Sequence, residues 1–121
     1  MPSRSYRNNN PGNIRWGSFA ESRGAVAEGP PNNQMAKWPT VVQGLAAMVS
    51  LLGVGAYREL TIPQMVERYA PSKDNNRPRE YADYVIQRSG VRRGDLISEM
   101  DPFQLLKVVE AMIRFEHWSA K

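Results

Sequence analysis

From residue 40 onward, apolar residues recur every three or four positions, and this spacing restricts the chain to a mainly helical fold. Side chains three or four residues apart share one face of a helix. Asp101-Pro102 is a typical helix start, and the apolar spacing after it continues to Phe115. Two neighbouring apolar rows lie in this stretch: Phe103, Leu106, Val109 and Ile113 in one, and Leu105, Val108 and Met112 in the other.

Three further helices are predicted from the same spacing and from the residues at their ends. Thr40 and Thr61 are candidate N-caps, whereas glycine and proline are typical of helix ends. The predicted helices run from Val41 to near Gly53 or Gly55, from Ile62-Pro63 until Pro71 stops the helix, and through Tyr81, Tyr84, Val85 and Arg88 to Gly90, with a short turn near Leu96 to Glu99.

The first 39 residues differ from the rest because proline, glycine and asparagine recur through them. Such a composition favours turns over regular elements. Apolar residues such as Trp16 and Trp38 still need a buried position, so we expect an ordered layer of loops. A short hairpin between Ile14–Phe19 and Ala25–Ala27 is possible. Residues 1–121 are expected to form a single domain, with a loop-rich region at 1–39 and a helical core at 40–121.

Composition excludes several classes of function. The chain has no cysteine, which removes disulfides, thiolate catalysis and Cys-ligated metal, and His117 is the only histidine. A multi-histidine metal site is therefore excluded, and we expect no cofactor. No apolar run is long enough to span a membrane, and the N-terminus lacks the apolar run of a secretory signal. The net charge of +4 favours association with polyanions. The basic residues are dispersed, however, which makes a nucleic-acid partner unlikely.

The segment from Asn8 to Arg15 concentrates side-chain amides around a Pro-Gly turn. Amides offer hydrogen-bond donors and acceptors without charge, as sugar hydroxyls and acetamido groups require. Asparagine side chains also bond their own backbone in turns. Composition alone leaves both interpretations of this segment open.

Glu116 follows a strongly apolar helix and stands beside Phe115, His117 and Trp118. A carboxyl against aromatic surface is desolvated, so its pKa rises, as a general acid for glycosidic cleavage requires. The alternative is an exposed glutamate near the chain end, paired with Arg114 or Lys121.

Two other groups of residues could border a cleft. Glu21 and Glu28 lie in the glycine-rich front region, where either could act as a second carboxylate, although solvated loop charge explains both. Tyr69 stands at a helix end next to a loop that carries Asn75. That position favours a hydroxyl at a cleft edge, whereas Tyr81 and Tyr84 have the spacing of core residues.

The order of these motifs resembles small phage-encoded virion proteins and lysozyme-like effector domains. The resemblance spans nearly the whole chain. It rests on Asn8 to Arg15, Trp38-Pro39 with Gly44-Leu45, Thr61 to Pro71 with Asp74-Asn75 and Tyr81, and finally Glu116. It implies a small lysozyme-like helical domain.

The motifs are also similar to those of bacterial glucosaminidases and lytic transglycosylases, in which a helix-end glutamate precedes an asparagine-rich loop and a Tyr-Ala segment. Here the order is circularly permuted, because the loop is N-terminal and the glutamate is last. The resemblance implies cleavage of the β-1,4 bond between amino sugars of peptidoglycan. Glu116 would then be the catalytic residue, and Asn9, Asn13, Tyr69 and Asn75 would bind the glycan strand.

A rival hypothesis is a glycan-binding or virion structural module that keeps the fold but lacks turnover, since His117-Trp118 departs from the small residues that usually follow the catalytic glutamate. Whether cleavage is hydrolytic or leaves an anhydro product stays open. Without a visible export signal, the expected location is the virion or the bacterial cytoplasm. A virion or secretion-apparatus protein would then deliver the chain to the periplasm or cell wall.

Overall fold

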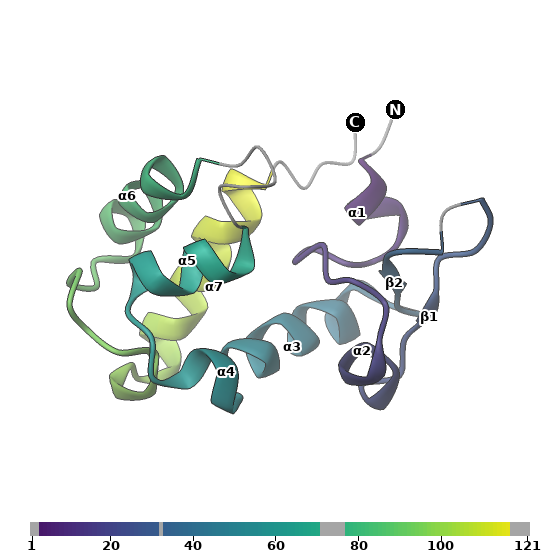
Figure 1. Ribbon diagram of the computed structural model, residues 1–121, viewed down its shortest axis with the longest axis horizontal. Coiled ribbons are helices and arrows are strands. Elements are labelled where there is room, and N and C mark those ends of the chain that lie inside the picture. The colour runs from purple at the N-terminus through teal and green to yellow at the C-terminus, as the bar shows by residue number, and fades with distance from the viewer. Residues whose placement is uncertain (1–2, 32, 71–76, 117–121) are drawn as a thin grey trace. The chain divides into compact units, whose positions relative to one another are not determined.

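The computed structural model describes residues 3–31, 33–70 and 77–116. It is mainly helical with one small antiparallel sheet, as the sequence predicts (Figure 1). Its contacts divide the chain into two compact units. The first unit comprises Met1–Ser50 together with Glu116–Lys121, and the second comprises Leu51–Phe115. Each unit is described by itself below.

The N-terminal part of the first unit, up to residue 39, contains more regular structure than the predicted layer of loops. Helix α1 spans Arg4–Arg7 and α2 spans Ser18–Ser22. Strand β1, Val26–Ala27, pairs antiparallel with β2, Ala36–Lys37, so that Val26 faces Lys37 and Ala27 faces Ala36. An isolated antiparallel bridge joins Arg15 to Met35.

The predicted hairpin is therefore wrong in its pairing. The segment at Ala25–Ala27 does form a strand, but its partner is β2, and Phe19 lies in α2 rather than in a strand. The physical reason is the tight helical turn of α2. After α2 the chain turns back, and the Ala25 N–H donates to the Ala20 carbonyl at 3.1 Å. The chain before α2 is then left to pair with Met35.

The core of the first unit forms around Trp38, which is almost fully buried. Its ring Nε1 donates to the Arg23 carbonyl at 3.0 Å, and its backbone N–H donates to the Asn8 carbonyl at 2.9 Å. The other buried apolar residues of this unit are Ile14, Ala20, Ala25, Met35, Ala36, Ala47 and Met48.

Helix α3 spans Val41–Leu52, as predicted. Thr40 caps it, because Gln43 N–H donates to the Thr40 hydroxyl at 3.3 Å. Gly44 allows a very close approach of the asparagine segment: a Cβ built on Gly44 would lie 1.9 Å from the Asn9 carbonyl oxygen. The missing side chain of Gly44 is therefore what lets the asparagine segment lie against this helix.

The second unit contains the remaining predicted helices. They are α5 at Ile62–Tyr69, α6 at Pro78–Ser89 and α7 at Pro102–Phe115. The short α4, Gly55–Arg58, was not predicted, and the expected turn is a 3-10 helix, η2, at Ile97–Glu99. Helix α6 packs against both α5 and α7.

Local capping explains where these helices begin and end. At the start of α5, Thr61 N–H donates to the Gln64 side-chain Oε1 at 3.0 Å. Asp101 caps α7 through its Oδ1, which accepts from Gln104 N–H at 2.8 Å. Gly90 ends α6 in the left-handed conformation with φ of 76°, where a residue with a Cβ would be strained.

The core of the second unit consists of the inward faces of α5, α6 and α7. On α7, the predicted row that begins at Phe103 is only partly buried, because Phe103 and Leu106 are exposed whereas Val109 is fully buried. In the other row, Val108 and Met112 are fully buried. Burial on α5 and α6 follows the predicted spacing, with Met65, Val66, Tyr81 and Val85 inside.

Candidate functional site

The asparagine segment that follows α1 is held together by its own side chains. Asn10 is fully buried. Its side-chain Nδ2 donates to the Ile14 carbonyl at 2.9 Å and to the Ala36 carbonyl at 3.0 Å, and its Oδ1 accepts from Ile14 N–H at 2.9 Å. Asn10 therefore ties the segment to β2 and is a structural residue.

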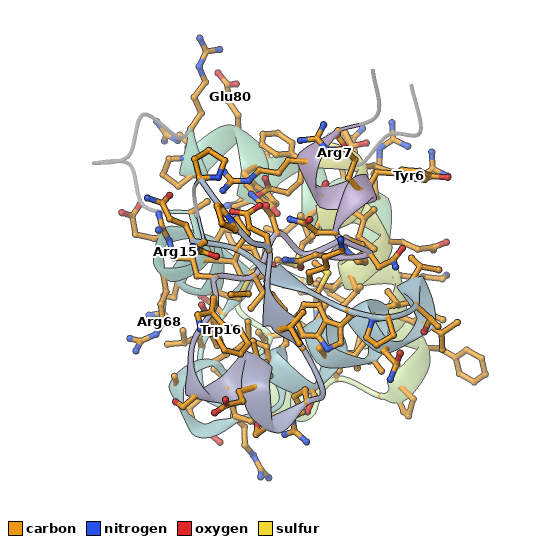
Figure 2. All side chains as sticks on the ribbon, turned by 90° about the vertical axis from the view of Figure 1, so that its right-hand side faces the viewer. Tyr6, Arg7, Arg15, Trp16, Arg68 and Glu80 are labelled. Carbon is orange, nitrogen blue, oxygen red and sulfur yellow. The ribbon has the colours of Figure 1, made fainter. Side chains whose placement is uncertain are left out.

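Asn9 and Asn13 adopt the left-handed backbone conformation, with φ of 52° and 49°. Asparagine tolerates this region better than most residues, which explains its use here. Asn9 Nδ2 donates to the Trp38 carbonyl at 2.9 Å and to the Pro39 carbonyl at 3.2 Å. The amide nitrogen of Asn9 is therefore engaged in the fold. Asn13 is exposed. Arg15 and Trp16, two and three residues further along the sequence, are labelled in Figure 2.

Glu28 lies at the centre of a polar cluster that the sequence did not predict. Its Oε2 accepts from Arg4 Nε at 2.9 Å and from Asn8 Nδ2 at 3.0 Å, and its Oε1 accepts from Met35 N–H at 3.1 Å. Arg4 also forms a second contact with Oε1. The side chain of Glu28 is only 9% exposed.

These contacts fix the ionisation of Glu28. Together, the hydrogen bond from Arg4, which has the largest effect, and the Asn8 and Met35 donors lower the pKa of Glu28 from 4.5 to about 2, against the opposing effect of burial. The interpretation of Glu28 as solvated loop charge is wrong. A carboxylate with this pKa stays ionised near neutrality and cannot act as a proton donor there. Glu21, in contrast, is exposed on α2.

Glu116 follows directly after α7 and is half-buried. It belongs to the compact unit that contains the asparagine segment. Phe115, the last residue of α7, stacks on Tyr81 with ring centroids 4.1 Å apart and meets Tyr84 at 5.5 Å. The prediction that Tyr81 is a core residue is confirmed, and Tyr84 is half-buried. His117 and Trp118 lie outside the described residues.

Tyr69, the last residue of α5, is half-buried and meets Tyr57 in a tilted arrangement with ring centroids 6.2 Å apart. The Arg68 guanidinium lies 5.8 Å from the centroid of the Tyr57 ring. Burial raises the pKa of Tyr57, and the charge of Arg68 opposes that shift. Asn75, the other expected binding residue of this region, lies outside the described residues.

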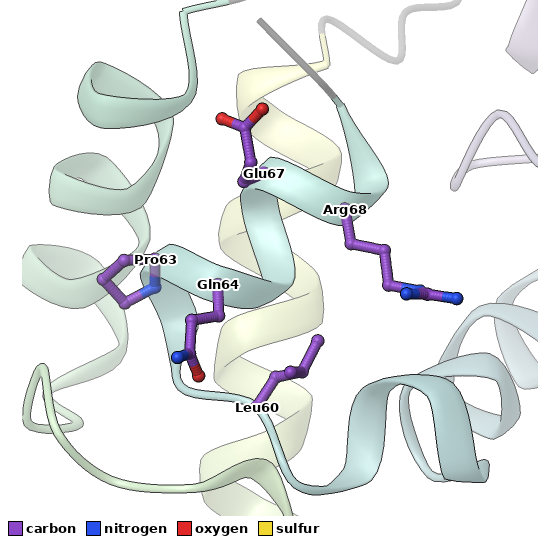
Figure 3. Close-up of a pocket in the computed structure, with 5 residues that line it drawn as sticks. All are labelled: Leu60, Pro63, Gln64, Glu67 and Arg68. Atoms are coloured by element: carbon purple, nitrogen blue, oxygen red, sulfur yellow. The ribbon is translucent and has the colours of Figure 1, made fainter.

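The second unit also contains an open depression of about 520 Å³ along α5. Leu60, Pro63, Gln64, Glu67 and Arg68 line it. Figure 3 shows that these side chains point in different directions, with Glu67 and Arg68 on separate sides of the helix. A reaction site needs groups that converge on one atom. This depression lacks such convergence.

Neither a metal-binding cluster nor a membrane-spanning helix is found in the described part of the chain. Within residues 3–31, 33–70 and 77–116, no cluster of three or more histidine, cysteine, aspartate or glutamate side chains could hold a metal ion. No helix in the same ranges is both long and apolar enough to cross a membrane.

Of the expected site residues, the structure groups Asn9, Asn13 and Glu116 in the first unit and assigns Tyr69 to the second. The Arg4–Glu28 pair was missed because 24 residues separate its members and no local spacing signals it. No protein-family model matches the chain, and no curated protein matches its sequence.

Proposed function

We propose that the chain cleaves peptidoglycan at the β-1,4 bond between amino sugars, with Glu116 as the catalytic acid. The observation that carries this proposal is the position of Glu116. It is half-buried and falls in the same compact unit as the asparagine segment, although 100 or so residues separate the two in sequence. A phage or secreted-effector origin, with delivery by a virion or secretion-apparatus protein, belongs to the same proposal.

In the proposed reaction, the protonated Glu116 carboxyl donates its proton to the glycosidic oxygen as the C–O bond breaks. The carboxylate then accepts a proton from the attacking nucleophile. That nucleophile is either water or a hydroxyl of the substrate itself. The second case gives an anhydro product and needs no second carboxylate.

The ionised, saturated Glu28 is unsuited to activate water, because donors already occupy both of its oxygens. This favours attack by the substrate's own hydroxyl. Glu21 is the alternative second carboxylate for a hydrolytic reaction, since it is exposed in the same unit.

The glycan would be held by the amides that remain available. Asn9 uses its Nδ2 for the fold, which leaves Oδ1 to accept from a sugar hydroxyl. Asn13 is exposed and can offer both its donor and its acceptor. Excess positive charge on the chain would favour an anionic cell wall.

The test compares release of soluble muropeptides by the wild type and by Glu116→Gln. Removing a general acid lowers the rate about a hundredfold to ten-thousandfold. Glu110→Gln is the matched control, because Glu110 is an exposed glutamate on α7. Circular dichroism checks that both variants fold. Equal release by Glu116→Gln and the wild type would refute the catalytic assignment.

The second candidate is a glycan-binding or virion structural module without turnover. The observation that favours it is the use of the Asn8, Asn9 and Asn10 side chains within the fold. It predicts binding to insoluble peptidoglycan with no muropeptides released by the wild type. Binding that is lost in Asn13→Ala, with no cleavage in any variant, would select this candidate.

A further inference from the structure

A second depression lies in the first unit, along one face of α3. Its volume is about 270 Å³, and Arg23, Gln43, Ala46, Ala47 and Ser50 line it. The residues from α3 stand at positions i, i+3, i+4 and i+7, so they share one face of the helix. Arg23 follows directly after α2. All of these residues belong to the first unit, so the depression is complete within that unit.

The side-chain amide of Gln43 is oriented by Thr40. The Thr40 hydroxyl donates to Gln43 Oε1 at 3.0 Å, which leaves Gln43 Nε2 as the donor that this amide can offer to a ligand. A Cβ built on Gly24 would lie 4.0 Å from Gln43 Nε2. The amide nitrogen therefore lies beside the chain that leaves α2, next to Arg23.

Arg23 supplies a positive charge at the same end of the depression. Its carbonyl accepts from Trp38 Nε1 at 3.0 Å, and its guanidinium carbon lies 5.3 Å from the centroid of the Phe19 ring. No carboxylate in the described part of the chain pairs with Arg23. A guanidinium over an aromatic face keeps its N–H groups available in its own plane, where they bind a carboxylate through two parallel hydrogen bonds.

The rest of the depression limits the size and shape of a ligand. Ala46 is exposed and Ala47 is buried, and both offer only methyl groups. The half-buried Ser50 adds a hydroxyl seven residues after Gln43, which is about 10 Å along the helix axis. A free acid of a few atoms cannot reach from one end to the other. An extended peptide of two or three residues can, at about 3.3 Å per residue.

We propose that this depression binds the carboxyl terminus of a short peptide with small side chains. The terminal carboxylate lies between the Arg23 guanidinium and Gln43 Nε2. The small side chains lie over Ala46 and Ala47, and the Ser50 hydroxyl bonds a peptide group at the other end. Capture of a terminal carboxylate is a recurrent mode of peptide recognition. The single cation matches the single charge of a carboxylate, and the site does not rest on the proposed cleavage by Glu116.

NMR titration of the full chain with N-acetyl-alanyl-alanine, from micromolar to tens of millimolar, tests this site. The backbone amide signals of Gly24, Gln43 and Ser50 should shift in a saturable way. The same peptide with an amidated carboxyl terminus, which lacks the charge, should bind about tenfold more weakly or less well still. Acetate should also bind more weakly than the peptide, because it cannot reach Ser50. No saturable shift, or equal binding of the two peptides, overturns the proposal.

Variants separate the charge from the shape of the site. Arg23→Gln should raise the Kd for the peptide about tenfold or more, and Arg23→Lys should raise it less, because lysine keeps the charge but not the paired hydrogen bonds. Arg15→Gln is the matched control, since Arg15 is an exposed arginine of the same unit. It should bind like the wild type, and a loss equal to that of Arg23→Gln would refute a specific site.

Ala46→Leu tests whether the peptide lies along α3. Ala46 is exposed, so the helix accepts leucine, whereas the larger side chain fills the floor of the depression. This variant should bind the peptide at least about tenfold more weakly. Wild-type affinity in Ala46→Leu would show that the peptide does not occupy the depression. Circular dichroism checks that each variant folds.

Discussion

The two units are stabilised by different interactions. In the first unit, polar side chains hold the backbone: Asn10 makes three hydrogen bonds to main-chain groups, and Glu28 receives donors from three residues. In the second unit, apolar faces of α5, α6 and α7 pack against one another. The difference indicates that the asparagine segment, which looked like a ligand-binding loop, owes much of its composition to folding.

The largest expected effect tests the tightest contact of the first unit. In Gly44→Ala, the new Cβ would lie 1.9 Å from the Asn9 carbonyl oxygen and 3.1 Å from Pro11 Cδ. Either the segment or α3 must shift, and we expect a loss of about 4 kcal/mol in the free energy of unfolding. Urea unfolding followed by tryptophan fluorescence measures this loss.

Gly55→Ala is the matched control in a helix of the second unit, because a Cβ there has nothing within 4 Å. It should stabilise the chain by up to about 1 kcal/mol, the difference in helix propensity between the two residues. Similar effects of the two substitutions would contradict the close approach of Asn9 to α3.

Asn10→Ala comes next. It removes the Asn10 acceptor of Ile14 N–H and the Asn10 donor to the Ala36 carbonyl inside the first unit, and it leaves the Ile14 carbonyl with the Ala36 N–H alone. We expect a loss of about 3 kcal/mol, since buried groups without hydrogen bonds are costly. Asn13→Gly is the control in the same segment, because glycine accepts its positive φ. If Asn10→Ala proves as stable as Asn13→Gly, polar side chains do not hold this unit together.

The smallest expected effect concerns Glu28 and pH. Because its pKa is lowered from 4.5 to about 2, the ionised form stabilises the fold fully above pH 4.5, and this contribution is lost as the pH falls toward 2. Glu28→Gln should cost about 2 kcal/mol at neutral pH. Its stability should also vary less with pH than that of the wild type in this acidic range.

Stability measured by urea unfolding at several pH values checks this expectation. Glu21→Gln provides the comparison, since Glu21 is an exposed glutamate in the same unit. It should keep the acid-dependent loss of the wild type. A Glu28→Gln variant with the wild-type pH profile would show that the Arg4–Glu28 pair does not stabilise the first unit.

The sequence predicted the second unit much better than the first. Thr61, Gly90 and Asp101 act on residues at most four positions away, so the starts of α5 and α7 and the end of α6 could be read locally. The pairing of β1 depended on Met35 and on the turn of α2, and it was predicted incorrectly. Glu28 was misjudged because Arg4 is 24 residues away.

The candidate site shows the same division. A helix-end glutamate beside aromatic residues was visible in the sequence, and Glu116 does follow directly on the stacked pair of Phe115 and Tyr81. The sequence did not show which asparagine side chains the fold leaves available to a ligand. Only the fold distinguishes buried Asn10 from exposed Asn13, although both are amides in one short segment.

By itself, the sequence determined the mainly helical class, the caps of the long helices and the absence of cysteine chemistry. These depend on residue type and on spacing within a few positions. Only the tertiary structure decided which polar side chains stabilise the fold and which apolar ones stay exposed. Contacts between distant residues decide those questions: Asn10 reaches Ala36, Glu28 reaches Arg4, and Phe103 remains outside the core that Val108 enters.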